Sequence, residues 1–554
     1  MKSQWFYGII KTNKNKNEVL EMQRYDKGEG REQVKVVSLE ELIDQDNPVR
    51  VIDAFVDSRD MIKLGFKYAE TKETGRKPKD PSDMCKLYIY CYYNGIRSSR
   101  KIERECTKNI EIMWLTDNIK PHNKTISDFR KDNKEVVERL LTEFNMICDM
   151  LGLIGKEMSA VDGSKFRASN SRRRNLTKNK VKKMIKHHEE SVREYLELLE
   201  ENDKEIKEQT LKTKTKEELQ EKLNEAQKRI GELLETAEEI EKNGNISLTD
   251  KDSKHMSVSN NGTDISHNVQ VAVDSKHHLV VAVDVTSSPV DHGQLYNMSA
   301  LAAKEFGIEL KEIKEETEEF QDVINVEETK SENEIKKDNK VKDNEKANSE
   351  YLMTVLADKG YYQYEDLKKC LEAGILPIVP KQKNSTKTGN ENYIIDNFIY
   401  DINNDTYICP ENQILINVSR KDSKEYSYKN KIACMQCPQK DQCTTNANGR
   451  IIKRSEKNDV YEKVNEIMDK NKEVYKLRQQ IVEHPFGTIK RALGYTYFLT
   501  RGNKSVRAES VMHFLVYNLK RVINIKGVRF LVAFLNSLTL HLFLIFGKTS
   551  LKLA

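Results

Sequence analysis

Residues 267–285 read HNVQVAVDSKHHLVVAVDV, and this stretch decides the fold. Apolar and polar side chains alternate over 267–274 and again over 278–285, and the polar residues DSKH join the two runs. A period of two is typical of strands, and a short polar link allows two such strands to pair with each other. The stretch therefore predicts a β-hairpin.

Strands and helices alternate on both sides of this hairpin. A weak strand is predicted over 158–162 (MSAVD), and stronger strands over 351–358 (YLMTVLAD) and 374–380 (GILPIVP). Helical spacing covers 291–306, 364–373 and about 460–491. The order strand, hairpin, helix, strand, helix, strand, helix predicts an α/β fold, in α+β form, with helices packed on a mixed sheet. This is the element order of an RNase H-like core.

The other segments differ from this core in composition. Helical spacing over 81–153 predicts a small all-helical unit. Apolar steps of three and four over 178–243 predict two coiled helices, whose seam meets either its own other half or another subunit. Residues 309–350 are acidic and poor in apolar residues, which indicates disorder.

The predicted divisions follow from these patterns. They are the helical domain 1–155, the first core strand with a basic arm 156–177, the coiled-coil insert 178–245, core strands and a helix 246–308, the acidic insert 309–350, core strands 351–400, the cysteine-rich insert 401–455, the last core helix 456–525 and an apolar C-terminal helix 526–554.

Composition limits the classes of protein and the compartment. The 554 residues carry 93 Lys and Arg against 88 Asp and Glu, a net charge of +5, so any nucleic-acid surface must arise from local clustering. The nine cysteines and the opening MKSQWFYGII, which lacks the features of a signal peptide, predict a cytoplasmic protein without a disulfide framework. The apolar run 530–546 contains Asn536, Ser537, Thr539 and His541, so we expect a buried or partner-facing helix and no membrane span.

Three acidic residues are candidates for a metal-dependent site. Asp162 ends the strand 158–162, Asp358 ends the strand 351–358, and Glu483 lies in the last helical block with Tyr475, Arg478 and Lys490 around it. Aspartates at neighbouring strand ends are also common turn residues, and Glu483 with Lys490 is also compatible with a surface ion pair. Three carboxylates can instead hold two magnesium ions for an in-line displacement at a phosphodiester.

A basic segment follows Asp162 directly. Ten Lys or Arg and no acid occur between Ser164 and His188, which fits neutralisation of phosphates, although a solvated arm on a coiled coil has the same composition. The first candidates for contact with DNA are Lys165, Arg167, Arg172, Arg173 and Arg174.

Four of the cysteines fall in one segment. Cys409 in YICP is followed by Cys434, Cys437 and Cys443 in CMQCPQKDQC. Four thiolates at such spacing suit a structural zinc ion, and buried free thiols are the alternative. The other five cysteines lie in helical patterns and are expected in the core.

Five motifs in order resemble a known family, the DDE transposases of bacterial insertion sequences, in the branch with an N-terminal helical domain and a Tyr, Arg, Glu, Lys signature. They are GIRSSRKIE (95–103), VDGSKFRAS (161–169), VAVDVTSSPVDHGQL (281–295), LADKGYY (356–362) and VEHPFGTIKR (482–491). The resemblance extends from residue 39 to residue 525.

The resemblance implies specific roles. Asp162, Asp358 and Glu483 would be the catalytic triad that holds Mg²⁺, or Mn²⁺ in its place. Tyr475, Arg478 and Lys490 would contact double-stranded DNA near the cleaved strand. The implied reaction is cleavage at the terminal inverted repeats of the element and transfer of the 3′-hydroxyl into target DNA, by a homodimer on DNA.

The sequence also departs from the family pattern. Four residues separate Arg478 from Glu483, whereas the signature has three. Pro485 lies two residues after Glu483 and predicts a kink or a new helix start there. The altered spacing keeps two rivals open: a catalytically inactive or domesticated DNA-binding protein derived from a transposase, and a plain metal-dependent nuclease.

Overall fold

The computed structural model describes residues 36–70, 77–205, 216–258, 262–313, 351–382, 388–420, 425–455 and 457–550. The chain divides into two units, Met1–Asp44 and Gln45–Ala554. The described part of the first unit contains one short helical turn, η1 (Glu40–Leu42). All contacts reported below lie within the second unit.

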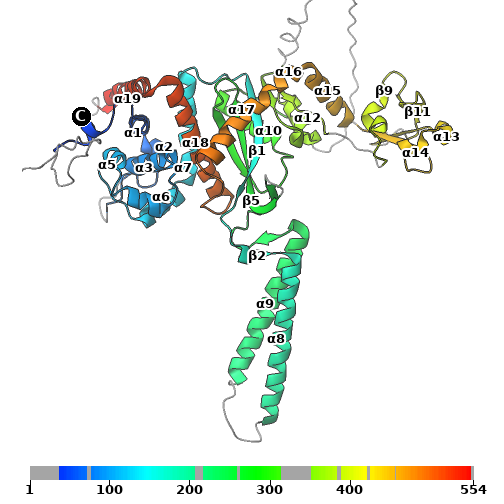
Figure 1. Cartoon of the computed structure of the whole chain (residues 1–554), viewed down its shortest axis with the longest axis horizontal. Helices are drawn as coiled ribbons and strands as arrows, with labels where there is room; N and C mark the ends of the chain where they lie inside the picture. The colour runs from blue at the N-terminus through cyan, green and yellow to red at the C-terminus, as the bar shows by residue number, and fades with distance from the viewer. Residues whose placement is uncertain are drawn as a thin grey trace, which may run out of the picture. The chain divides into compact units, whose positions relative to one another are not determined.

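A six-stranded mixed sheet forms the centre of the second unit (Figure 1). The strand order is β4-β5-β1-β7-β8, and β6 pairs with β5. Strand β1 is antiparallel to β5 and parallel to β7, and β7 is parallel to β8. The strands are β1 (Met158–Arg167), β4 (Lys254–Val258), β5 (Gly262–Asp274), β6 (Val280–Thr286), β7 (Met353–Leu356) and β8 (Ile375–Ile378).

The predicted hairpin is confirmed as β5 and β6, which pair from Asn268 opposite Thr286 to Val273 opposite Val280. Strand β5 begins earlier than predicted, at Gly262, because its first residues pair with β4. Strand β1 is also longer than predicted and continues to Arg167, because β5 pairs with it along that whole length.

Helices pack against this sheet. Helix α10 (Leu295–Phe306) contacts β1, β5 and β6, and α12 (Tyr364–Glu372) contacts β8. Helix α17 (Leu477–Gly487) contacts β1 and β5, and α18 (Asn503–Lys526) contacts β5 and β6. A mixed sheet covered by helices agrees with the predicted α/β fold.

The N-terminal part of this unit is all-helical, as predicted for 81–153. Helix α3 is buried over most of its length, and α3 and α7 pack against α18 of the core. The main helices are α1 (Val49–Asp57), α2 (Met61–Leu64), α3 (Pro81–Tyr93), α4 (Ser99–Glu105), α5 (Ile110–Leu115), α6 (Asn123–Asp132) and α7 (Lys134–Met150).

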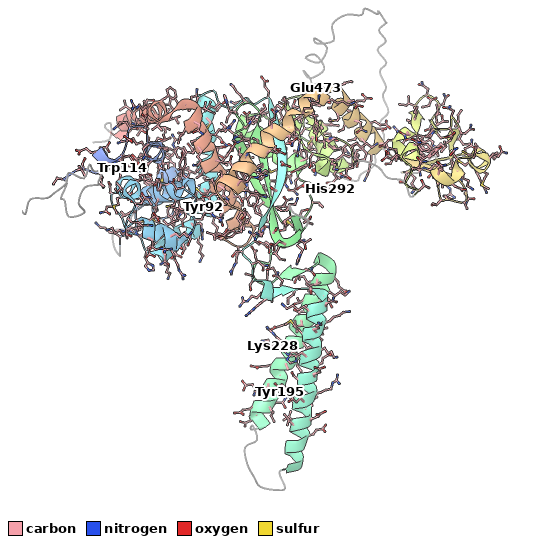
Figure 2. The ribbon with its side chains drawn as sticks, viewed as in Figure 1. Tyr92, Trp114, Tyr195, Lys228, His292 and Glu473 are labelled. Atoms are coloured by element: carbon pink, nitrogen blue, oxygen red, sulfur yellow. The ribbon has the colours of Figure 1, made fainter. Side chains whose placement is uncertain are left out.

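The segment between β1 and β4 forms a helical hairpin. Helices α8 (Lys178–Glu205) and α9 (Lys216–Asn243) pack on each other, and Tyr195 and Lys228 lie on them (Figure 2). The apolar seam therefore meets its own other half within the chain. A two-stranded sheet of β2 (Asn175–Leu176) and β3 (Ile246–Ser247) closes the base of this hairpin.

The cysteine-rich segment contains a second sheet that the sequence patterns did not predict. Its strand order is β13-β12-β11-β10-β9, all antiparallel. The elements are β9 (Ile399–Asp401), β10 (Thr406–Ile408), β11 (Ile414–Asn417), β12 (Tyr426–Lys429), α13 (Lys431–Gln436), α14 (Lys440–Cys443) and β13 (Ile451–Arg454). Of the acidic insert predicted as disordered, residues 314–350 lie outside the described residues.

The helical block predicted over about 460–491 is divided in the structure into several helices. It consists of α15 (Lys457–Lys470), α16 (Lys472–Tyr475), α17 and a π-helical turn, η6 (Thr488–Ala492). Helix α17 continues through Pro485, so no new helix begins at that residue. The π-helical turn instead changes the direction of the side chains after Gly487.

The C-terminal region is helical. Helix α19 (Val528–Ser550) follows α18 and packs on α1. Among the described residues, no single helix has the length and apolarity to cross a membrane, whereas α18 with 528–540 passes the same test as a pair bent by 110°.

Candidate active site

Strand pairing brings two of the predicted acidic residues level with each other. Ala160 of β1 lies opposite Leu356 of β7 in a parallel ladder, so Asp162 and Asp358, each two residues farther on, reach the same edge of the sheet. The prediction that Asp162 ends its strand is wrong, because pairing with β5 carries β1 on to Arg167. It is the neighbour β7 that ends there, at Leu356.

Arg478 of α17 connects the two aspartates. Its Nη2 atom is 3.1 Å from Asp162 Oδ1 and 3.8 Å from Asp358 Oδ2. Burial raises the pKa of Asp162 to about 6, Arg478 opposes this rise, and Asp358 adds to it by like-charge repulsion. The two carboxylates therefore point toward one position, where they stabilise a positively charged group.

A third aspartate, Asp291, lies beside these two and was given no role in the sequence analysis. Its Oδ1 accepts hydrogen bonds of 2.7 Å from Asn268 and from Gln270, and Lys165 Nζ is 3.4 Å from both oxygens. Asn268 and Gln270 are fully buried in β5. Two amide residues within a strand of the central sheet were the signal for this site, because buried polar groups need partners.

Two glycines leave room for Asp291 next to the other acids. A Cβ atom on Gly163 would lie 2.5 Å from Asp291 Oδ1 and 2.3 Å from Gln270 Nε2. A Cβ atom on Gly360 would lie 2.8 Å from Asp358 Oδ1 and 3.6 Å from Asp291 Oδ2. Asp291 thus lies between the residue after Asp162 and the turn after Asp358.

Glu483 is not brought into contact with the aspartates. It is exposed on α17, and its Oε1 accepts a hydrogen bond of 2.8 Å from Gln479. Within the described ranges, no three His, Cys, Asp or Glu side chains are grouped so that they could hold a metal ion. Asp162 and Asp358 fit a hard divalent cation by donor type and by convergence, and Glu483 does not complete the set in this conformation.

Two segments of the chain match known protein families. Residues 37–132 match the family described as "Transposase domain (DUF772)", and residues 408–523 match the "Transposase DDE domain". The chain belongs to the DDE transposases of insertion sequences. Neither the curated proteins nor the solved structures contain a match.

Membership implies several general properties of this transposase. It is a nuclease-type enzyme, it binds DNA, it uses a divalent metal ion, and its core is RNase H-like. The second match includes Arg478, Glu483 and Lys490, whereas Asp162 and Asp358 lie outside both matches. The pairing of β1 with β7 brings these aspartates together, and the ion pairs of Arg478 join them to the signature helix.

The signature residues of the transposase lie around the aspartates in different ways. Tyr475, at the end of α16, has its pKa raised by burial and, to a smaller degree, by the two aspartates. Lys490 and Glu483 do not lie on one face of a continuous helix, because the π-helical turn η6 begins between them. From the π-helical turn its Nζ donates to Ser164 Oγ at 2.7 Å and to the carbonyl of Lys165 at 2.8 Å. Burial lowers the pKa of Lys490 to about 8.

The predicted basic arm separates into two parts in the transposase. Lys165 is mostly buried and bound to Asp291, so it belongs to the site itself. Arg167, Arg173 and Arg174 are exposed, and the side chain of Arg172 lies outside the described residues. Arg173 and Arg174 form the turn η2 (Arg172–Arg174) at the base of the hairpin.

The four clustered cysteines of the transposase line one small cavity of about 30 Å³ beside the second sheet. Burial raises the pKa of the Cys443 thiol to about 11, and Cys434, Cys409 and Cys437 add to this rise. The structure thus gathers Cys409, Cys434, Cys437 and Cys443, although they do not form a ligand group in the described residues. The zinc ion stays a prediction. The other five cysteines are buried, as predicted.

Proposed function

We propose that this transposase cleaves DNA at the inverted-repeat ends of an insertion sequence and transfers the freed 3′-hydroxyl into target DNA. The observation that carries the proposal is the convergence of Asp162 and Asp358 on Arg478, across two paired strands and the signature helix. Two convergent carboxylates beside a guanidinium are suited to a polyanionic substrate with a cation between them. We place the reaction in the cytoplasm, at the nucleoid, on a protein dimer that holds both ends.

The proposed metal ligands are Asp162, Asp358 and Glu483. Two magnesium ions held there, or manganese in their place, would supply activation of the attacking oxygen and stabilisation of the leaving oxygen. Glu483 lies on α17, which packs on β1, the strand of Asp162. The proposal therefore requires the Glu483 side chain to leave its hydrogen bond with Gln479 and to turn toward the two aspartates.

The protein's own side chains orient the site. Arg478 offsets the repulsion between Asp162 and Asp358. Lys490 ties the π-helical turn to β1 through Ser164, and this contact supports a positioning role besides the contact with DNA implied by the signature. Asp291 holds Lys165 at the edge of the site, where its ammonium group can meet a phosphate.

Cleavage of a supercoiled plasmid that carries the DNA flanking this gene tests the proposal. We expect cuts at discrete positions near both ends with Mg²⁺, none with Ca²⁺, and none with Asp358→Asn. Asp469→Asn, an exposed aspartate of α15 paired with Lys472, is the matched control and should cut normally. Joined products distinguish a transposase from a plain nuclease, which leaves cut ends.

A DNA-binding protein without catalysis is the second candidate, and the separation of Glu483 from the two aspartates favours it. Under this alternative, the wild type and Asp358→Asn bind the element ends equally, and neither cuts with Mg²⁺ or Mn²⁺. That result would replace the first proposal.

We further propose a structural zinc ion at Cys409, Cys434, Cys437 and Cys443, supported by the cavity that all four thiols line. The purified protein should contain about one zinc per chain, and Cys437→Ser should lose it. Four thiols that react freely in the native protein, without metal, would contradict this site.

A further inference from the structure

A cleft of about 390 Å³ lies between the N-terminal helices and the loop that precedes α18. Helices α6 and α7 form one wall, and residues 499–505 form the other. Cations and hydroxyl groups dominate its lining, and none of the described residues that line it is acidic or aromatic. The lining residues are Ser127, Arg130, Lys131, Lys134, Leu499, Thr500, Arg501 and Ser505.

Most of the positive charge of the cleft has no acid close to it, and of its described cations only Arg130 interacts with an acid, the buried Glu509. In the part of the chain that the structure describes, no carboxylate lies within ion-pair distance of Arg130, Lys131, Lys134 or Arg501. The neighbouring acid Asp132 pairs elsewhere, with Lys67 at 3.0 Å. Lys131 and Arg501 are exposed. Three positive charges without an acidic partner among the described residues, those of Lys131, Lys134 and Arg501, therefore surround a hollow that an anion can enter.

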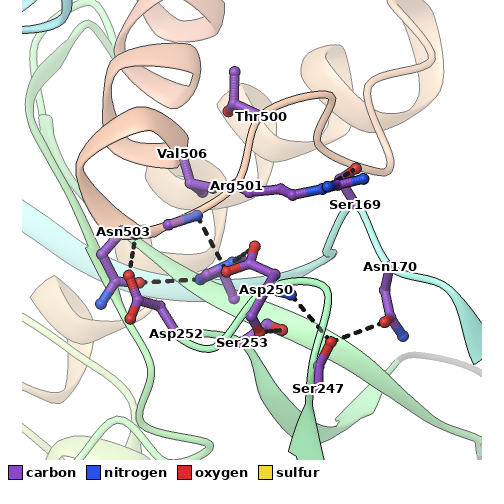
Figure 3. Close-up of polar contacts among 12 residues, drawn as sticks. Ser169, Asn170, Ser247, Asp250, Asp252, Ser253, Thr500, Arg501, Asn503 and Val506 are labelled. Atoms are coloured by element: carbon purple, nitrogen blue, oxygen red, sulfur yellow. Dashed lines mark hydrogen bonds and ion pairs between the residues drawn. The ribbon is translucent and has the colours of Figure 1, made fainter. Parts of the chain in front are cut away.

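The loop that carries Arg501 is held in place from both sides. Before Arg501, the backbone N–H groups of Leu499 and Thr500 donate to the buried Glu509 at 3.1 and 2.9 Å. After it, Gly502 N donates to Asp250 at 3.1 Å and Asn503 N to Asp252 at 2.8 Å (Figure 3). A wall ordered in advance loses little entropy when it binds a ligand.

The same loop is joined to the strand of the candidate active site. Residues 496–498 run beside the end of β1, where Arg167 pairs with Tyr497, and Arg501 Nε donates to Ser169 Oγ at 3.4 Å. Arg167 is five residues beyond Asp162, about 17 Å along a strand at roughly 3.3 Å per residue. One wall of the cleft is thus tied to the strand that carries Asp162.

We propose that this cleft binds the phosphate backbone of the duplex DNA on which the candidate active site acts, between helices α6 and α7 on one side and the loop before α18 on the other. The inference rests on the proposed function for its substrate. Lys, Arg and hydroxyl side chains are the usual partners of DNA phosphates. Because aromatic side chains do not line the cleft, it suits a duplex backbone better than stacked single-stranded bases.

Binding of a labelled duplex as a function of salt, in Ca²⁺, tests the cleft. The variant Lys131→Ala/Lys134→Ala/Arg501→Ala removes three of its charges. Arg130 stays, because it also interacts with the buried Glu509. The control Lys63→Ala/Lys228→Ala/Lys470→Ala removes three exposed charges from α2, α9 and α15. Milder substitutions, Lys131→Gln with Arg501→Gln, repeat the test if the triple variant unfolds.

The cleft variant should lower the slope of log K against log salt by about 2 to 3, and weaken binding roughly 10-fold or more, on element ends and on random duplex alike. It should also lose part of the backbone protection that the wild type gives to the duplex. The control should keep the wild-type slope and footprint.

Contrary results separate this inference from the proposed function. A wild type that cleaves, with a cleft variant of unchanged slope and footprint, overturns the cleft and leaves the function standing. Loss of binding to single-stranded DNA alone, or displacement of the duplex by inorganic phosphate at equal phosphate concentration, also overturns it. A wild type that binds duplex through the cleft but never cuts leaves the cleft standing and removes the function.

Discussion

The pKa of Asp162 is set by burial and neighbouring charges that act in opposite directions. Burial and the carboxylate of Asp358 raise its pKa, and Arg478 at 3.1 Å opposes that rise. Ligation of a divalent cation needs the charged form of the carboxylate. The protonation of Asp162 should therefore be visible in both stability and activity.

Stability should fall with rising pH through the titration of Asp162. Its pKa is about 6 in the folded chain, against 3.8 for an aspartate in water, so the folded state binds the proton more tightly. This contribution is fully present below about pH 4 and is lost as pH rises through about 6. Thermal unfolding without divalent ions should show a steeper fall of stability with pH in the wild type than in Asp162→Asn, where Asp83, whose pKa is also raised to about 6, still contributes.

Metal-dependent cleavage should change in the opposite direction. It should rise with pH up to about 6 and level off above it, because Asp162 must lose its proton to ligate a cation. Rates measured from pH 5 to 8 check this expectation, and a flat profile through pH 6 would contradict it.

Gly163→Ala adds a single methyl group and should disrupt the packing of the site. The new Cβ would lie 2.5 Å or less from atoms of Asp291 and Gln270, both held by hydrogen bonds. We expect a loss of about 1–3 kcal/mol in the free energy of unfolding, together with a large loss of cleavage. Gly231→Ala, on α9 with open space around it, should instead stabilise its helix by about 0.5–1 kcal/mol. Equal behaviour of the two variants would argue against the close packing at Asp291.

At the scale of elements, the helical hairpin has its own small core. Leu176, Val181, Leu233 and Ile240 are buried together at its base, and β2 pairs with β3 beside them. The hairpin should therefore unfold locally without the main sheet.

Leu233→Ala tests this independence. Removal of a buried leucine side chain costs about 2–5 kcal/mol, depending on how well the site closes. We expect faster amide hydrogen exchange in α8 and α9, with unchanged exchange in β1, β5 and β7. Leu234→Ala removes the same atoms from the exposed side of α9 and should have little effect. Faster exchange throughout the sheet would contradict the independence of the hairpin.

At the scale of the whole Gln45–Ala554 unit, two buried asparagines join the helical region to the sheet. Asn518 of α18 accepts from Val280 N at 2.9 Å and donates to Val280 O at 2.8 Å. Asn145 of α7 donates to Val281 O at 3.0 Å. These amides satisfy backbone groups of β6 that have no strand beside them, and they connect α7, α18 and the sheet.

Asn518→Leu should destabilise the whole unit. Leucine has a similar volume but leaves the N–H and C=O of Val280 buried without partners, at about 1–3 kcal/mol for each group. Denaturant unfolding followed by far-ultraviolet circular dichroism should show a loss of roughly 2–5 kcal/mol. Asn224→Leu, at an exposed position of α9, should change stability by less than about 0.5 kcal/mol. A small effect at both positions would show that Asn518 does not carry this connection.

The sequence by itself determined the local elements and the family. The hairpin of β5 and β6, the coiled helices α8 and α9 and the helical N-terminal region were predicted because their apolar periods are local properties of the chain. The five motifs were enough to identify the transposase family, which the two matches confirm.

Only the tertiary structure decided how distant residues meet. The parallel register of β1 and β7 brings Asp162 beside Asp358, and packing of α10 and its preceding loop places Asp291 between Gly163 and the turn after Asp358. The π-helical turn directs Lys490 to β1 and away from Glu483. These contacts depend on strand register and helix packing between segments far apart in the chain, and a local pattern of side chains does not encode such register.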